Sequence, residues 1–229
     1  MPVAIITGGT KGIGLSTAKL LHQKGFDICV CSSDDVNVNA AKVELADSVL
    51  VLKCDVVNYE DVKRVFSAAS NRFGSIDVLV NAAATIINKP FESMTVEDFD
   101  NVMNVNFKSC VFTIKQAFKY MTNGGSIINI SSLGGLPGYE KFNGFSAYSV
   151  SKYAVTGLTE ILSVEAKEKN IRINAIAPGA VNTDMLAKAA PGLKSKTEPH
   201  DVATIIEFLS DESKSGHISG AVIPLNTNL

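Results

Sequence analysis

A tyrosine and a lysine stand four residues apart, at Tyr148 and Lys152, near the start of a long helical pattern. Side chains with this spacing lie on one face of a helix. A phenol has a pKa of ~10 and is a poor base at neutral pH, but a nearby ammonium group favours the phenolate and lowers that pKa. Tyr148 could then exchange a proton with a carbonyl oxygen. A half-buried tyrosine beside an exposed lysine is also common on helices, so this pair needs further support.

Two more polar residues could complete such a site. Ser132 follows the β-forming run 126–131, and its hydroxyl could bond a substrate oxygen and stabilise charge that develops there. Serine after a strand is also ordinary turn chemistry. Asn106 lies inside a helical pattern, where asparagine is disfavoured, so it could have a function. Asn101 and Asn104 lie in the same pattern, however, and Asn106 could equally be an asparagine that the helix tolerates.

A glycine-rich loop, T-G-G-T-K-G-I-G at residues 7–14, follows the first apolar run. Gly8 can turn the chain sharply out of a strand, Gly12 lets the backbone approach a pyrophosphate, and Gly14 lets the next helix pack closely. The N-terminus of that helix offers free N–H groups and a partial positive charge to phosphates. A tight strand-to-helix turn is the alternative. Three glycines in this spacing favour a dinucleotide site.

The elements that must position these residues alternate along the chain. The expected strands are short and apolar: 3–7, 28–32, 49–53, 78–81, 126–131, 172–177 and 221–224. The expected helices are amphipathic: 14–24, 59–73, 96–121, 148–169 and 199–209. Strands that are apolar throughout are typical of parallel sheets covered on both faces. The sequence therefore predicts an α/β fold with a doubly wound, mostly parallel seven-stranded sheet flanked by helices, in a single domain over residues 1–229.

Composition and charge argue against several other classes of protein. The chain has 21 Lys and Arg against 23 Asp and Glu, a net charge of −2, and shows no basic stripe of the kind that binds nucleic acid. No apolar run reaches the ~18 residues that span a bilayer. Residues 1–7 lack a basic leader before their apolar stretch. We therefore expect a cytoplasmic protein with neither a nucleic-acid nor a membrane partner.

The four cysteines, Cys29, Cys31, Cys54 and Cys110, bear on metal and redox chemistry. Cys29 and Cys31 would point to one face of a strand and could form a metal or redox pair. Small buried apolar residues in a reduced cytosol are the favoured interpretation. No cluster of His or Cys supplies the rest of a metal site, so none is expected.

The glycine spacing T-G-x-x-x-G-x-G, the Tyr148/Lys152 pair and Ser132 together resemble the short-chain dehydrogenase/reductase family, including its 3-ketoacyl-carrier-protein reductase-like members. The resemblance covers nearly the whole chain. It implies a Rossmann-type fold and an NAD(P)(H)-dependent oxidoreductase that interconverts a carbonyl and an alcohol by hydride transfer, with Tyr148 as general acid/base. The catalytic residues that it implies are Asn106, Ser132, Tyr148 and Lys152. In this family the residue matching Asn106 holds a water that relays protons from the lysine to solvent.

Other matches to the family concern the cofactor. Residues 81–84 follow the fourth strand, where the family usually has N-N-A-G. Residues 54–56 follow the third strand, where the family's Asp meets the adenine. Residues 177–183 follow the sixth strand, where Thr183 would meet the nicotinamide carboxamide. The cofactor-binding residues implied are Gly8, Thr10, Lys11, Gly12, Ile13, Gly14, Ser33, Asp55, Val56, Asn81, Ala83, Tyr148, Lys152, Pro178, Gly179, Val181 and Thr183.

The choice between NAD(H) and NADP(H) depends on the end of the second strand. Counting ~20 residues past the last glycine reaches Asp34, and an acid there argues for NAD. The family's register instead places the discriminating position at Ser32, which cannot repel a 2′-phosphate. Lys11, inside the glycine loop, could reach that phosphate, and Ser33 could add a hydrogen bond. These positions favour NADP(H) over NAD(H).

The chain departs from the family's pattern in three places. Ala82 and Ala84 replace the second asparagine and the glycine of N-N-A-G. Ser132 and Tyr148 are 16 residues apart (148 − 132), more than is common, so residues 138–145 could carry an insertion beside the site. The segment 183–199 is short for a substrate-covering loop, which implies an open site or a small lid.

The substrate itself is a small-molecule carbonyl or alcohol whose identity the sequence does not define. The pocket loops, 84–90, 133–145 and 185–196, suggest an apolar wall from Leu133, Leu136, Tyr139, Phe142, Phe145 and Met185. The resemblance also implies a homotetramer or homodimer, with 96–121 and 148–169 as candidate interfaces. The alternative function is a non-catalytic NAD(P)-binding sensor or scaffold of the same fold. A sugar-nucleotide epimerase or dehydratase is disfavoured, because 229 residues leave no room for its larger C-terminal domain.

Overall fold

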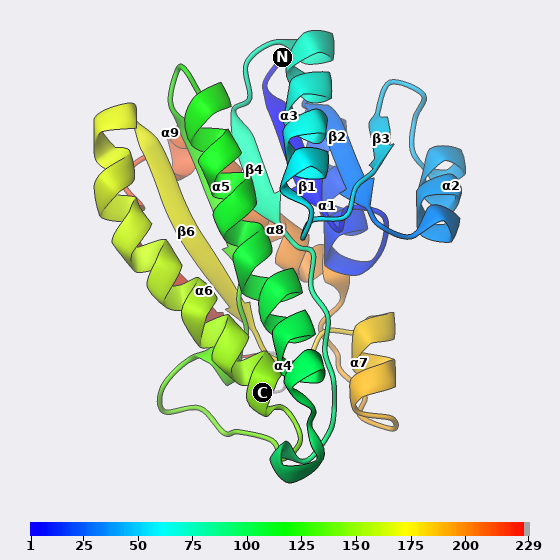
Figure 1. Cartoon of the computed structure of the whole chain (residues 1–229). Coiled ribbons are helices and arrows are strands. Elements are labelled where there is room, and N and C mark those ends of the chain that lie inside the picture. Colours follow the sequence, from blue (N-terminus) through cyan, green and yellow to red (C-terminus); the bar gives the residue numbers. More distant parts are fainter. Residues whose placement is uncertain (227–229) are drawn as a thin grey trace.

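The seven strands of the described chain form one sheet in which every neighbouring pair is parallel (Figure 1). They are β1 (Val3–Thr7), β2 (Asp27–Ser32), β3 (Leu50–Lys53), β4 (Val78–Asn81), β5 (Gly125–Ile130), β6 (Ile171–Pro178) and β7 (Val222–Leu225). The structure is a computed structural model that describes residues 1–226, so residues 227–229 of the expected domain lie outside the described residues. The predicted seven-stranded, doubly wound Rossmann-type sheet is confirmed, with each expected strand displaced by at most one residue at either end.

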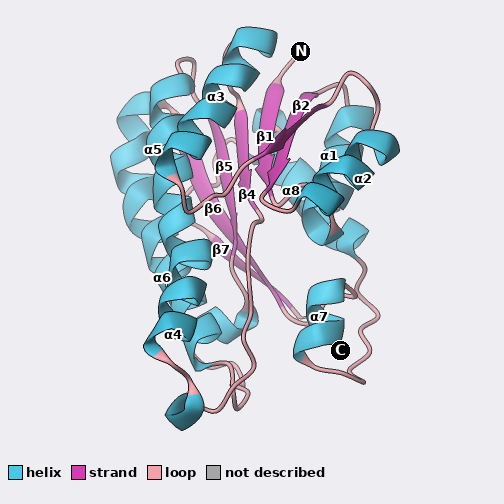
Figure 2. Ribbon diagram, turned by 45° about the vertical axis from the view of Figure 1, so that its right-hand side comes forward, coloured by secondary structure: helices cyan, strands magenta, loops and turns pink. Residues whose placement is uncertain are grey.

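Helices cover both faces of this sheet, as Figures 1 and 2 show. One layer contains α1 (Gly12–Gln23), α2 (Asp35–Glu44) and α8 (Pro199–Ser210), and the other contains α3 (Tyr59–Phe73), α5 (Ser109–Tyr120) and α6 (Ser146–Glu165). Alternate residues of a strand point to opposite faces. In β1, Val3 and Ile5 therefore pack into the core beneath α3 and α5, while Ala4 and Ile6 pack into the core beneath α1 and α8.

The strand order, β3-β2-β1-β4-β5-β6-β7, reverses direction between β1 and β4. From β1 the chain moves outward to β2 and β3, then returns to β4 and continues to the other edge. The loops that follow β1 and β4 therefore diverge, and a ligand can lie between them at the carboxyl ends of the strands. These ends point downward in Figure 1, toward α4 (Val96–Met103) and α7 (Asp184–Ala189).

The helix expected over 96–121 is one continuous helical run that ends at Tyr120, but a π-helical turn, Asn104–Lys108, divides it into α4 and α5. A π turn contains one residue more than an α turn, and it leaves the apolar periodicity on either side intact. Three short helices were also missed: α2, α7 and α9 (Glu212–Ser215). The Asp34 side chain caps α2 by accepting a hydrogen bond from the Asn37 N–H at 3.0 Å. None of the helices formed by residues 1–226 combines the length and the apolar composition needed to cross a bilayer.

Candidate active site

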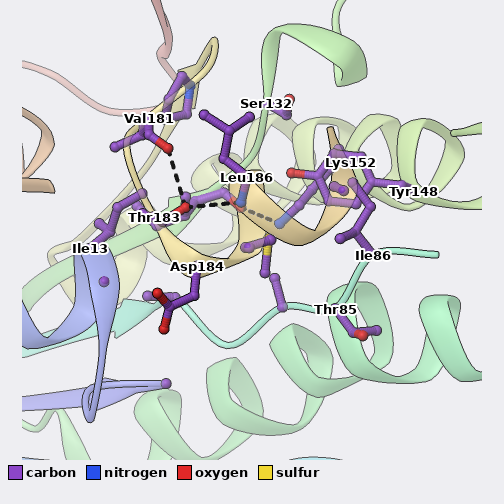
Figure 3. A pocket seen from close by; sticks show the side chains of 18 of the residues that line it. Ile13, Thr85, Ile86, Ser132, Tyr148, Lys152, Val181, Thr183, Asp184 and Leu186 are labelled. Carbon is purple, nitrogen blue, oxygen red and sulfur yellow. Dashed lines mark hydrogen bonds between the residues drawn. The ribbon is translucent and has the colours of Figure 1, made fainter. Parts of the chain in front are cut away.

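A cavity of about 990 Å³ lies at the carboxyl ends of the strands, where the order reverses. It brings together segments from most of the chain. Figure 3 shows Tyr148 and Lys152 on one side of the view, and Val181 and Thr183 on the other. The predicted site residues that line it are Gly8, Thr10, Lys11, Gly12, Ile13, Gly14, Ser33, Asp55, Val56, Ala83, Ser132, Tyr148, Lys152, Pro178, Gly179, Val181 and Thr183. Asn81, Asn106 and Leu136 do not line it.

The glycine loop between β1 and α1 is packed so tightly that side chains would not fit. Gly8 has φ +64°, a conformation that favours glycine, and a Cβ there would lie 2.8 Å from the backbone of Ala83. A Cβ on Gly14 would collide with the carbonyl oxygen of Gly8, so Gly14 closes α1 onto its own loop. At Gly8, Gly12 and Gly14 the loop therefore presents bare backbone to the cavity.

The segment after β4 is held against this loop through Thr7. The N–H of Ala82 donates to the Thr7 carbonyl oxygen at 3.3 Å, and the N–H of Ala83 donates to the Thr7 hydroxyl at 3.3 Å. A Cβ on Gly8 would collide with the Ala83 backbone, so the two segments pack backbone against backbone, and the side chains after β4 are only methyl groups. The alanines at positions 82 and 84 thus leave the cavity open here, and both line it.

Tyr148 faces the cavity near the N-terminus of α6 and is half-buried. Burial raises the pKa of Tyr148, and a hydrogen bond with the Ser132 side chain acts in the opposite direction. The expected lowering by a neighbouring ammonium is therefore corrected: the net direction is upward. Ser132 also accepts the Gly134 N–H at 3.1 Å, which fixes its side chain at the end of β5. The phenol and the hydroxyl thus share one corner of the cavity.

Lys152 is almost fully buried, 2% exposed, and its Nζ donates to the carbonyl oxygen of Ile130 at 2.7 Å. The ammonium lies 5.6 Å from the centre of the Tyr148 ring. Burial lowers the pKa of Lys152 to about 8, because the charged form loses hydration. The close packing depends on Gly135, where a Cβ would lie 2.6 Å from the Cβ of Lys152.

Asn106 lies in the π-helical turn, 1% exposed, and ties three segments together. Its Oδ1 accepts the Thr85 N–H at 2.7 Å, and its Nδ2 donates to the Thr85 carbonyl at 2.9 Å and to Ser151 Oγ at 2.9 Å. Ser151 Oγ in turn donates to the Tyr148 carbonyl at 2.7 Å. The Asn106 side chain thus fixes Thr85, which lines the cavity, to the helix that carries Tyr148.

Asn81 lies beneath the cavity, inside a buried series of polar side chains. Its Nδ2 donates to Asn129 Oδ1 at 2.8 Å, and its Oδ1 accepts from the Thr113 hydroxyl at 2.8 Å. Asn129 Nδ2 donates to the Thr159 hydroxyl at 2.9 Å. This series connects β4 and β5 to α5 and α6, so Asn81 supports the site from below.

The far end of the cavity, at β2 and β3, is polar. Ser32, Ser33, Asp34, Asn37 and Asp55 all line it. The Asp34 carboxylate is already engaged by the Asn37 N–H, and Asp55 Oδ1 accepts the Val57 N–H at 3.1 Å. Lys11 lines the cavity from the glycine loop and is exposed.

The outer end of the cavity is formed by three segments, 84–90, 133–145 and 184–193, here called the mouth segments. Lys141 folds the second one, because its Nζ donates to the carbonyls of Leu136 at 2.6 Å and Tyr139 at 2.9 Å. The Lys89 N–H donates to the Gly144 carbonyl at 3.0 Å, and Asn88 Nδ2 donates to the Ala189 carbonyl at 2.8 Å. The segment after Thr183 forms the short helix α7, which contributes Asp184, Met185, Leu186 and Ala189 to the wall.

Sequence reasoning missed several residues that position the site. Ser151 and Thr85 hold Asn106, while the Ser131 hydroxyl donates to the Lys152 carbonyl at 3.0 Å and lies 3.0 Å from Thr156 Oγ1. The sequence could have pointed to Ser151, because it lies three residues after Tyr148 and therefore about one helical turn from it. Thr85 gives no such signal, since it acts through its backbone.

Metal and cysteine chemistry can be stated for the described residues. Within residues 1–226, no three His, Cys, Asp or Glu side chains gather closely enough to hold a metal ion. The four cysteines are free and buried, as expected for small apolar residues. Burial raises the pKa of the Cys29 thiol to about 12 and that of Cys110 to about 11.

Comparison with known proteins gives a consistent result. The profile of a family described as short chain dehydrogenase matches residues 2–194. An uncharacterized oxidoreductase of Staphylococcus aureus (strain USA300) is 30% identical over 220 residues, covering 95% of this chain and 94% of the relative. Hydroxynaphthalene reductase-like protein Arp2 of Metarhizium acridum is 36% identical over 254 aligned positions, covering 97% and 92%.

Two solved structures share the fold at high similarity. A single-residue variant of actinorhodin polyketide ketoreductase, solved with NADPH, superposes with a TM-score of 0.88 at 25% identity, covering 98% of this chain and 95% of that one. Levodione reductase superposes with a TM-score of 0.89 at 28% identity, with the same coverage.

Proposed function

Because this chain belongs to the short-chain dehydrogenase family and is an NAD(P)-dependent oxidoreductase acting on CH–OH and C=O groups, we propose that it interconverts a small-molecule carbonyl and an alcohol with Tyr148 as general acid/base. The observation that carries the proposal is the placement of Tyr148, Ser132 and Lys152 around one corner of a cavity whose other wall is the glycine loop. Actinorhodin ketoreductase and levodione reductase, by name reductases of carbonyl compounds, support it.

The cavity fits a nicotinamide dinucleotide. Gly8 and Gly12 form a cradle without side chains, and Gly12 faces Thr183, whose Cγ2 would lie 3.5 Å from an added Cβ. Helix α1 begins here, and no side chain caps its first N–H groups, which leaves them able to bind phosphate oxygens. We assign the pyrophosphate to Gly8–Gly14, the adenine end to Asp55 and Val56, and the nicotinamide end to residues 178–183.

The proposed chemistry divides between the cofactor and the protein. When bound, the nicotinamide supplies or accepts the hydride. During reduction Tyr148 donates its phenolic proton to the carbonyl oxygen, and its raised pKa keeps that proton in place beforehand. Ser132, bonded to Tyr148, offers its hydroxyl to the same oxygen. Lys152, beside the ring, stabilises the phenolate that remains. Asn106 positions these groups and, by analogy with the family, holds the water that returns a proton.

We propose NADP(H) as the preferred cofactor. Ser32 and Ser33 at the end of β2 are neutral, and Lys11 can reach a 2′-phosphate from the glycine loop. The nearest acid, Asp34, is engaged in capping α2. The solved ketoreductase relative that contains NADPH supports this choice.

We also propose a cytoplasmic homotetramer or homodimer in which residues 1–229 act as one cofactor-binding and catalytic unit. The outward face of α6 carries Val150, Tyr153, Ile161 and Val164, which are between 39% and 60% exposed. Four exposed apolar side chains along one helix are typical of a subunit interface. The free, buried cysteines agree with a reducing compartment. Light scattering at assay concentration tests the assembly, and a monomer would contradict it.

The function is tested by titrating the protein with NADPH and NADH and then measuring turnover of ketones, aldehydes, β-ketoacyl thioesters and sugar alcohols. We expect tighter binding of NADPH and NADPH oxidation with at least one carbonyl compound. Binding with no turnover across the panel would contradict the reductase and support a sensor or scaffold. Failure to bind either cofactor would contradict the assigned site as well.

A further inference from the structure

The wall of the cavity outward of Tyr148 is predominantly apolar. Each of the three mouth segments contributes to it, and its main side chains are Ile86, Leu133, Phe142, Phe145, Met185 and Leu186. Leu193 lies at the rim and is half exposed. Apolar surface that faces a cavity is stabilised when a ligand of the same character removes it from water.

Three aromatic rings run from the solvent to the proposed acid. Phe142, at the outside, is 60% exposed. Its ring centre lies 6.3 Å from that of Phe145 at an interplanar angle of 64°, and Phe145 lies 6.3 Å from Tyr148 at 68°. Rings arranged edge to face leave their faces available to a further flat group. Among the aromatic rings of the described residues, only that of Phe145 packs against Phe142.

The charged side chains that line the cavity at its mouth are negative. Of the lysines and arginines in residues 1–226, those that line the cavity are Lys11, in the glycine loop, and Lys152, beside Tyr148. The charged side chains of the mouth segments that line the cavity are Glu140 and Asp184, whereas Lys188 of the third segment does not line it. Lys89 pairs with Asp98 at 2.7 Å, and Lys141 is bound to backbone carbonyls. An anionic group in the outer part of the cavity would therefore lie beside carboxylates, with no lysine of the mouth segments lining the cavity to offset them.

We infer that the substrate is an uncharged carbonyl compound with an apolar ring system, which packs against Phe142 and Phe145 while its carbonyl group reaches Tyr148. This inference rests on the reductase function proposed above. It separates this chain from relatives that reduce thioesters carried by an anionic coenzyme or carrier protein, and it assigns Phe142 and Phe145 to specificity.

The first test compares three carbonyl compounds with NADPH as reductant. 2-Tetralone and 2-decanone each have ten carbons and no charge but differ in having rings, and acetoacetyl-coenzyme A is an anionic thioester. We expect kcat/KM for 2-tetralone to exceed both others by at least about tenfold. Equal or faster reduction of 2-decanone or acetoacetyl-coenzyme A would overturn the inference and leave the reductase function standing. If none of the three is reduced while another member of the panel above is, the inference is overturned and the reductase function stands; if NADPH binds and no member of either set is turned over, both are overturned.

The second test asks whether the ring packs where we place it. Phe142→Ala should raise KM for 2-tetralone by about three- to tenfold, the contribution of one aromatic contact, without changing the Kd of NADPH. Phe91→Ala is the matched control, because Phe91 is 71% exposed and does not line the cavity. Both side chains are at the surface, so neither variant is expected to unfold. An unchanged KM in Phe142→Ala, or an equal change in both variants, would overturn the assignment.

Discussion

Replacing Asn106 by alanine tests whether this side chain is the tie that joins the cavity wall to helix α6. Asn106 is buried in the π-helical turn and makes three side-chain hydrogen bonds, two to the backbone of Thr85 and one to Ser151. The alanine variant leaves the N–H and the carbonyl of Thr85 without these partners. Ser151 keeps its bond to the Tyr148 carbonyl, so the loss is concentrated at Thr85.

The magnitude follows from those two groups. An unsatisfied buried backbone group costs about 1–3 kcal/mol. Thr85 is half-buried, and water can reach part of it, so we expect a loss of about 2–4 kcal/mol in the free energy of unfolding. For a chain of this size each kcal/mol lowers the Tm by about 2–4 °C. The Tm of Asn106→Ala should therefore fall by roughly 4–16 °C.

Thermal unfolding followed by circular dichroism measures this change, with Asn101→Ala as control. Asn101 is an exposed residue of α4, one turn away from the π-helical segment, and its removal should change the Tm by little. Because Thr85 lines the cavity, turnover of Asn106→Ala should also fall at temperatures where the variant is still folded. A Tm within about 1 °C of the wild type, on the scale given above, would refute the reasoning, because it would mean that Thr85 does not depend on Asn106.

Three further predictions concern the proposed chemistry. Tyr148→Phe should reduce turnover by about 10²- to 10⁴-fold, the usual contribution of a general acid, with NADPH binding nearly intact; near wild-type turnover would exclude Tyr148 as the acid. Lys11→Ala should weaken NADPH binding more than NADH binding in parallel titrations, and an unchanged preference would remove Lys11 from 2′-phosphate recognition. Because burial lowers the pKa of Lys152 to about 8, the ammonium is lost as the pH rises through 8, and we expect kcat for reduction to fall there. The lowered pKa also means that charging Lys152 destabilises the folded state at pH values below 8. Lys152→Met should therefore be inactive yet more stable at pH 7, by up to about 3 kcal/mol in the free energy of unfolding. In urea titrations this gain should shrink between about pH 8 and 10.5, and a gain that stays constant over that range would contradict the account.

The parts of the fold that could be predicted are those whose cause is local. The glycine loop is an example, because each glycine answers a steric need that neighbouring residues create. The bounds of α3 were predicted as residues 59–73, since Asn58 caps its first turn and Val62, Val65, Phe66 and Ala69 recur at helical spacing. By contrast α2 has a weak apolar stripe, with only Val38 and Ala41 buried, so its residues show little periodicity to find.

Features that depend on packing could not be predicted in this way. The sequence places Lys152 one turn after Tyr148, but not its Nζ against the Ile130 carbonyl, 22 residues away in the chain. Burial of the phenol, which the spacing does not reveal either, raises the pKa of Tyr148 where the spacing alone suggested a fall. The tie between Asn106 and Thr85 joins residues 21 positions apart through backbone atoms, for which side-chain type is no guide.

The hydrogen bonds that join the three mouth segments have a consequence for protein engineering. Asn88 is bonded to α7, and its neighbour Lys89 is bonded to Gly144, so residues 84–90 support both of the other segments. A mouth segment transplanted alone from a relative would arrive without the partners that hold it. Redesign of selectivity in this scaffold should therefore exchange all three segments together as one module, or change single side chains such as Phe142 and keep the backbone connections.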